Sequence, residues 1–113
     1  MTSLRAGDLV WVAFPYVETN QTKSRPALII SSPTLGPQSD LAWMAMITNA
    51  ANAPWPGDIA IKDFKALGLP IPSVIRTEKV STLEIGSANF VSRLPALLWH
   101  QVASTIQRHL AIQ

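Results

Sequence analysis

The spacing of apolar residues changes near the end of the chain, and this change most restricts the possible folds. Between residues 95 and 112 every fourth position is apolar, and Leu94 continues the line backwards. Apolar residues at this spacing form one face of an amphipathic helix, and Pro95 suits its first turn. The sequence therefore predicts a helix over 95–112 whose apolar face consists of Leu94, Leu98, Val102, Ile106 and Leu110.

Upstream of this helix, short apolar segments alternate with proline and glycine, a pattern typical of strands joined by turns. The segment 8–14 is apolar on both alternating faces, which indicates a central strand. We expect a polar loop at 16–25 and a single helical turn at 63–69 that stops at Gly68. The expected strands are 8–14, 26–31, 41–48 and 57–62, then one or two strands over 73–76 and 79–84, and a last short strand at 89–92. This order predicts a mainly β protein, a small antiparallel barrel with a C-terminal helix, as one domain over 1–113.

Charged residues make up only 14% of the 113 residues, against about 25% in typical globular proteins. So little charge leaves a monomer short of polar surface, and we therefore expect a homodimer. The net charge of +2 permits an anionic partner without requiring one.

Several other classes of protein are disfavoured. The longest apolar run, 41–47, is far shorter than the about 20 residues of a membrane-spanning helix, and Asp8 precedes any long apolar stretch, unlike in a secretory signal. We expect a cytoplasmic protein with no membrane partner. The chain has no cysteine, which makes a structural zinc site improbable.

No glycine-rich nucleotide-binding motif and no histidine pair at metal-ligand spacing occurs in the sequence. His100 and His109 both fall in the expected helix, where we interpret them as structural or solvated. The sequence therefore predicts no metal and no cofactor.

The polar residues that stand out lie at the ends of expected strands: Arg25, Thr48, Arg76 and Glu78. Arg76 and Glu78 are two positions apart, so on a regular strand they share a face, while Lys79 points the other way and is solvated. One interpretation is a structural ion pair. The other is an anion site, because arginine matches phosphate bidentately; two arginines, a hydroxyl and a carboxylate could bind a phosphodiester and stabilise the charge that develops during attack.

Four motifs in order resemble the MazF/PemK-type toxins of type II toxin–antitoxin systems. They are "GDLVWVAFPY", "KSRPALIIS", "MIT" and "PSVIRTEKVSTLE", and they cover nearly the whole chain. The resemblance implies an SH3-like β-barrel, a homodimer and a metal-independent endoribonuclease that cuts single-stranded RNA at selected sequences and inhibits growth. It also implies a cognate antitoxin that blocks the RNA groove. Binding of promoter DNA by the toxin–antitoxin complex stays open.

The resemblance also assigns candidate catalytic residues. Arg25 matches the family's arginine before the proline, Thr48 its threonine at the end of the third strand, and Arg76 the arginine of the "VIR" motif. Glu78 falls where one branch of the family has an aspartate, and its expected role is to accept the 2′-hydroxyl proton or to orient Arg76. The products would be a 2′,3′-cyclic phosphate and a 5′-hydroxyl.

We further expect RNA contacts from Asn20 and Gln21 in the first loop, from Lys23 near Arg25, and from Trp55 between two prolines. Trp55 could stack on a base or pack within its loop, and Lys23 could steer a phosphate or be solvated. The first loop lacks the catalytic histidine of one family branch. An alternative function is therefore a non-catalytic binding module, since this fold also serves toxins that bind a protein target such as gyrase.

Overall fold

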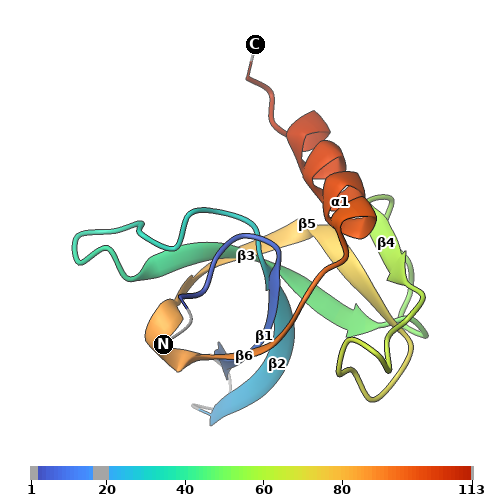
Figure 1. Ribbon diagram of the computed structural model, residues 1–113, viewed down its shortest axis with the longest axis horizontal. Coiled ribbons are helices and arrows are strands. Elements are labelled where there is room, and N and C mark those ends of the chain that lie inside the picture. The colour runs from blue at the N-terminus through green and yellow to red at the C-terminus, as the bar shows by residue number, and fades with distance from the viewer. Residues whose placement is uncertain (1–2, 17–20, 113) are drawn as a thin grey trace.

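One antiparallel sheet of six strands, followed by a helix, makes up the protein (Figure 1). The computed structural model describes residues 3–16 and 21–112. A short 3-10 helix, η1 (Ile85–Ser87), precedes the last strand, and helix α1 spans Ala96–His109. The strands are β1 (Asp8–Tyr16), β2 (Gln21–Ile29), β3 (Leu41–Asn49), β4 (Asp58–Ile61), β5 (Ser73–Glu84) and β6 (Ala88–Arg93). The prediction of a mainly β protein with a C-terminal helix is confirmed.

The sheet is curved but open. Its strand order is β4-β5-β3-β2-β1-β6, so β4 and β6 are edge strands and the expected barrel is not closed. Two separate groups of buried apolar side chains lie on the two faces of the central strands.

The central strands bury both faces. In β1, Leu9 belongs to one apolar cluster while Val10 and Val12 belong to the other, and all three are fully buried. The same alternation occurs in β3, where Ala45 and Met44 lie in different clusters. The two apolar faces of segment 8–14 thus correctly predicted a central strand.

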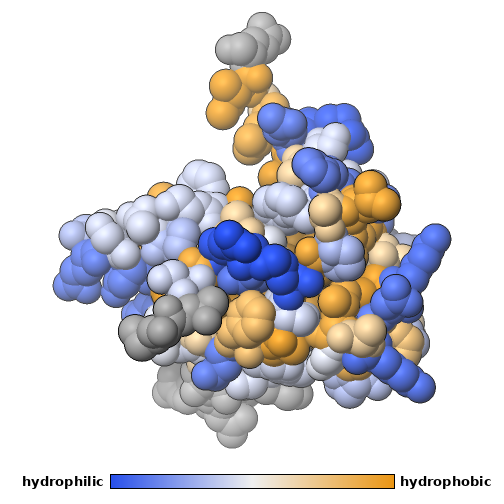
Figure 2. All heavy atoms as spheres, in the orientation of Figure 1, coloured by the Kyte–Doolittle hydropathy of each residue, from blue (hydrophilic) through white to orange (hydrophobic). Residues whose placement is uncertain are grey.

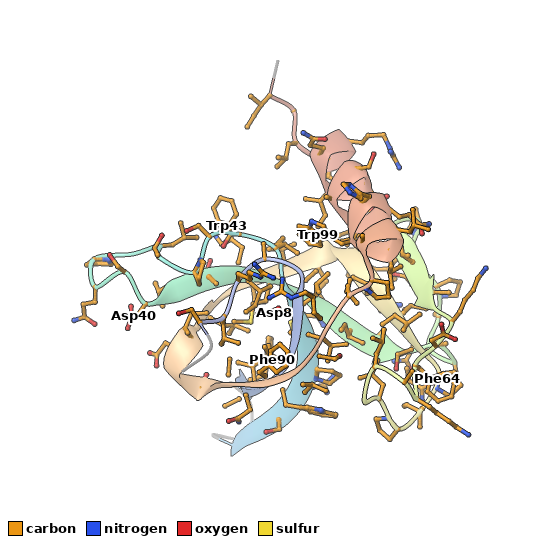
Figure 3. All side chains as sticks on the ribbon, in the orientation of Figure 1. Asp8, Asp40, Trp43, Phe64, Phe90 and Trp99 are labelled. Carbon is orange, nitrogen blue, oxygen red and sulfur yellow. The ribbon has the colours of Figure 1, made fainter. Side chains whose placement is uncertain are left out.

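Helix α1 covers one of these clusters. Val102 is fully buried within it, and Leu98 and Ile106 pack against it. Trp99, which is labelled in Figure 3, lies close to Gly7: a Cβ added to this glycine would lie 3.7 Å from Trp99 Cδ2. The helix ends at His109, three residues before the expected end, and Leu110 beyond it is half-exposed. Among the described residues, no helix is long and apolar enough to cross a bilayer.

Strand β2 begins earlier than the sequence predicted. Its backbone pairs with β1 from Gln21, whereas its pairing with β3 starts only at Ala27. Pro26 therefore lies outside the part of β2 that pairs with β3. No hydrogen bond to β3 is lost because proline lacks an N–H, and a proline is tolerated inside this strand. The expected loop 16–25 is thus largely strand.

The turn expected at 63–69 has helical character. The Leu67 N–H donates to the Asp63 carbonyl at 3.1 Å, and Gly68 adopts a φ of +88°. A left-handed residue ends a helical turn at low cost only when it is glycine.

Segments 73–76 and 79–84, for which the sequence allowed one or two strands, form one continuous strand, β5. Its register against β3 shifts abruptly: Val80 pairs with Ala45, but Arg76 pairs with the next residue, Met46. Residues 77–79 therefore bulge, and a bulge breaks the regular alternation of side chains. This irregularity decides which charged residues of β5 face the site described below.

Candidate functional site

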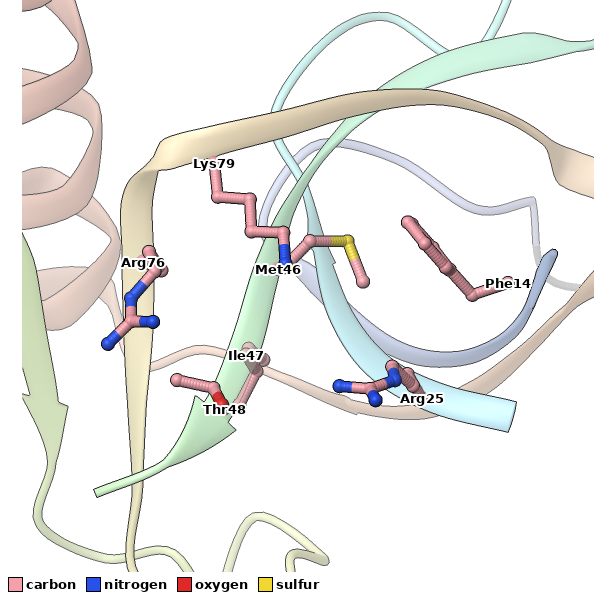
Figure 4. Close-up of a pocket in the computed structure, with 7 residues that line it drawn as sticks. All are labelled: Phe14, Arg25, Met46, Ile47, Thr48, Arg76 and Lys79. Atoms are coloured by element: carbon pink, nitrogen blue, oxygen red, sulfur yellow. The ribbon is translucent and has the colours of Figure 1, made fainter. Parts of the chain in front are cut away.

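A small hollow opens between side chains of β1, β2, β3 and β5 (Figure 4). Its volume is about 90 Å³, well below the roughly 300–1,000 Å³ of pockets that enclose whole small molecules. The hollow therefore suits one small group of a larger ligand. Its lining residues come from β1, β2, β3 and β5 and are Phe14, Arg25, Met46, Ile47, Thr48, Arg76 and Lys79.

Three of the four residues expected to be catalytic line this hollow. Figure 4 shows Thr48 at the end of β3, with Arg25 of β2 to one side and Arg76 of β5 to the other. Lys79 adds a third cation, and none of the lining residues is acidic. Two guanidinium groups, an ammonium group and a hydroxyl have the chemistry to bind an anion such as phosphate.

The structure places Lys79, and not Glu78, on the side of β5 that Arg76 faces. The bulge at residues 77–79 places Lys79 beside the hollow that Arg76 lines, while Glu78 lines a different hollow; both side chains are exposed. The expectation that Glu78 shares a face with Arg76 is wrong, because it assumed a regular strand. Its catalytic role thus loses its geometric basis within this chain.

Arg76 is held rigidly by the neighbouring edge strand. Its Nε donates to Asp58 Oδ1 at 3.0 Å and its Nη2 to Asp58 Oδ2 at 2.9 Å, and Nη2 also reaches the Ala53 carbonyl at 2.9 Å. The Trp55 ring stacks on the guanidinium, with 4.7 Å between Cζ and the ring centroid. The hydrogen bonds from Arg76 hold the pKa of the Asp58 carboxyl below its ordinary value, against the opposing effect of burial. An arginine fixed in this way is preorganised.

Thr48 is also fixed by a neighbour. The Asn52 side-chain amide donates to Thr48 Oγ1 at 2.7 Å. Because a hydroxyl has one hydrogen, a Thr48 that accepts from Asn52 keeps its own hydrogen to donate elsewhere. The loop between β3 and β4 therefore holds Thr48 through Asn52, and it holds Arg76 through Ala53 and Trp55 together with Asp58 at the start of β4.

Trp55 packs against a neighbouring side chain and is also partly exposed. The ring packs on the Arg76 guanidinium, yet 42% of the residue's surface stays exposed. Contact with a base remains a prediction. Of the other expected RNA-binding residues, Asn20 lies outside the described residues, and so do the side chains of Gln21 and Lys23.

A larger hollow continues from the first one past Thr48. The two hollows share Arg25, Ile47 and Thr48. The second hollow encloses about 370 Å³ and adds aromatic, amide and apolar groups from Trp11, Asn49, Asn52 and Ile71 among others. An extended ligand whose anionic group lies between Arg25 and Thr48 would therefore find further surface on this side.

Sequence reasoning missed Asp58, Asn52 and Lys79. Asp58 follows a Pro-Gly pair, and its pairing with Arg76 joins residues 18 positions apart. Asn52 is one of several polar loop residues with no distinguishing spacing. In the part of the chain that the structure describes, His, Asp and Glu side chains form no group of three that could hold a metal ion.

The fold and the cationic hollow together define a small β protein with a candidate anion site, and comparison with known proteins gives its family. The sequence profile of the PemK-like, MazF-like toxins of type II toxin–antitoxin systems matches residues 5–110. Since this match covers nearly the whole chain, the protein belongs to the PemK/MazF toxin family. No curated protein sequence matches it.

Solved structures agree with this fold. MazF from Deinococcus radiodurans is 23% identical and superimposes with a TM-score of 0.75, covering 99% of this chain and 100% of that one. The Mycobacterium tuberculosis toxin MazF-mt6 is 19% identical, with a TM-score of 0.68 and coverage of 93% and 98%. An endoribonuclease from a mycobacterial species, solved in complex with its cognate antitoxin, is 12% identical, with a TM-score of 0.71 and coverage of 98% of each chain.

Proposed function

We propose that this protein is a growth-inhibiting toxin that acts as an endoribonuclease on single-stranded RNA. The observation that carries the proposal is the small hollow in which Arg25, Thr48, Arg76 and Lys79 meet. Its size suits one phosphodiester, and the hollow that continues past Thr48 offers surface for an adjoining nucleoside. Family membership supports the same activity, because a structurally similar mycobacterial protein is described as an endoribonuclease.

In the proposed reaction the 2′-oxygen of one nucleotide attacks the adjacent phosphorus, and the bond from phosphorus to the 5′-oxygen breaks. The products are a 2′,3′-cyclic phosphate and a 5′-hydroxyl. Arg25 and Arg76 neutralise the charge that builds on the phosphoryl oxygens, and Thr48 donates a hydrogen bond to one of them. The attacking oxygen belongs to the RNA itself, so the reaction requires no metal-activated water.

The proton of the 2′-hydroxyl needs an acceptor, and the leaving 5′-oxygen needs a donor. Glu78 is the candidate acceptor from the sequence, although it lines the neighbouring hollow; solvent water is the other candidate. Lys79 and Arg25 line the hollow and are the candidates for the donor.

The proposed partners are a second copy of the chain and a cognate antitoxin. Large apolar side chains lie exposed on the described surface, among them Trp43 at 49% and Phe90 at 50% (Figure 3). Figure 2 shows further apolar surface over α1 and on the chain end beyond it. A surface with this much apolar area and so little charge suits burial against another chain. The mycobacterial complex supports an antitoxin as one such chain.

The test is incubation of the purified protein with long single-stranded RNA in the presence of EDTA. We expect cuts at a restricted set of sequences, with 2′,3′-cyclic phosphate ends, and none from Arg25→Ala. RNA that stays intact across varied sequences, together with growth arrest that survives Arg25→Ala, would instead favour a toxin that binds a protein target.

A further inference from the structure

We propose that Asp58 is a positioning residue, which fixes the Arg76 guanidinium so that it meets the phosphate during cleavage. This inference rests on the proposed endoribonuclease function and adds a residue to its site. Asp58 itself does not line the cationic hollow. It acts on the reaction only through Arg76.

The contact between the two side chains is bidentate and largely buried. Asp58 lies directly opposite Arg76 in the pairing of β4 with β5, and both carboxylate oxygens accept from the guanidinium, at 3.0 and 2.9 Å. Each side chain is only 10% exposed. These bonds and the one to the Ala53 carbonyl use Nε and Nη2, so Nη1 is the nitrogen that they leave available for a phosphate oxygen.

Asp58 is held in turn by its own loop. Its Oδ2 accepts from the Trp55 N–H at 3.0 Å, and its own N–H donates to the Trp55 carbonyl at 3.1 Å. The Trp55 ring covers one face of the guanidinium. The loop, the carboxylate and the ring therefore restrict Arg76 before any RNA binds, so the arginine need not lose rotamer freedom on binding.

The charge of Asp58 gives this role a distinctive signature. A carboxylate beside the hollow weakens the attraction between the protein and a polyanion, so its removal favours RNA binding. Its removal also frees Arg76 to leave the productive geometry, and a misplacement of about 1 Å can lower a rate by about 10²-fold. If the contact only stabilised the fold, its loss would slow the reaction without strengthening RNA binding.

The experiment compares Asp58→Asn with the wild-type protein. On an RNA that the wild type cuts, we expect kcat to fall by about 10–100-fold. Binding of the same sequence with methylated 2′-hydroxyls, which cannot react, should stay equal or become tighter. Asp58→Glu, which restores the charge, should recover part of kcat. Asp63→Asn, the same chemical change at an exposed carboxylate after β4, is the matched control and should leave both quantities unchanged.

Two further measurements decide whether the effect runs through Arg76. In an Arg76→Ala background, Asp58→Asn should cause no additional loss of kcat. If Asp58→Asn lowers kcat by the same factor with and without Arg76, the two residues act independently and the proposal is overturned. The Arg76 Nε–H signal in ¹⁵N NMR should be protected from exchange in the wild type and lose protection in Asp58→Asn. A signal that stays protected in that variant would overturn the proposal even in the absence of RNA.

The NMR measurement also separates this inference from the proposed function. If the wild type cuts no RNA, the endoribonuclease proposal fails, and exchange at Nε still reports whether Asp58 holds Arg76. If the wild type cuts RNA and Asp58→Asn cuts it equally fast, the positioning role fails while the endoribonuclease proposal stands.

Discussion

Among the glycines, Gly57 leaves the least room for a Cβ, and Gly57→Ala tests whether this packing matters. The residue lies directly before Asp58. A Cβ placed on it would overlap Thr77 Oγ1, and it would lie 3.1 Å from both Glu78 Cγ and His109 Nε2. Gly57 has no left-handed φ, so any loss in the variant arises from these contacts and not from the backbone conformation of alanine.

The expected cost follows from what must move. Thr77 is 2% exposed; its hydroxyl donates to the Gly57 carbonyl at 2.7 Å, and it lies 2.9 Å from His109 Nε2. Overpacking of this kind typically costs about 1–3 kcal/mol, and the loss of one of the two hydrogen bonds adds about 1 kcal/mol. We expect the free energy of unfolding to fall by about 2–4 kcal/mol, which for a domain of this size lowers Tm by about 8–16 °C.

Thermal and urea unfolding measure this change, and Gly86→Ala is the matched control. A Cβ on Gly86 meets nothing within 4 Å and needs no left-handed φ, so that variant should be neutral or slightly more stable. Since the overlap also displaces the backbone next to Asp58, Gly57→Ala should slow RNA cleavage as well. A Gly57→Ala protein as stable as Gly86→Ala would refute the reasoning, because it would mean that Thr77 and His109 move aside without lowering the free energy of unfolding.

Four further outcomes are expected. Arg25→Ala should abolish cleavage with little change in Tm, because the side chain acts on the charge that develops in the reaction; activity equal to the wild type would show that the site is misplaced. Glu78→Gln should stop cleavage if Glu78 accepts the 2′-hydroxyl proton, and full activity in this variant would leave solvent as the acceptor. The wild type should have a larger free energy of unfolding than Asp58→Asn, and this difference should have its full size above pH 3.8, the ordinary carboxyl pKa. It should shrink as the pH falls through the lower pKa of Asp58 in the folded protein, where the carboxylate becomes protonated. A difference that persists in urea titrations below that pH range would contradict the pairing with Arg76. Sedimentation at micromolar concentration should report a dimer, and a species of 12.3 kDa would argue against one.

The sequence predicted those elements whose signal lies within one segment. The four-residue period identified α1, and the two apolar faces of 8–14 identified β1 as central. These patterns are local, because the periods of a helix and a strand follow from backbone geometry alone. Arg25, Thr48 and Arg76 were selected as residues at strand ends, and the structure brings all three to one hollow.

Predictions that depended on pairing between segments were less accurate. The sequence could not show that β2 extends back to Gln21, because that segment is polar and owes its strand conformation to β1. It also could not show that the sheet stays open, since closure depends on whether two edge strands meet. Leu110 continues the apolar line of the helix, yet it lies beyond the last helical residue.

Taken by itself, the sequence determined the elements, their order and the three residues of the hollow that carry the resemblance to the toxin family. The tertiary structure alone decided that Lys79 and not Glu78 joins Arg76, because the bulge in β5 arises only in the register against β3. It also decided that Asp58 holds Arg76, a contact made by the pairing of β4 with β5. Side-chain direction follows from local geometry only while a strand is regular, and the partner of a charged group depends on which strand folds beside it.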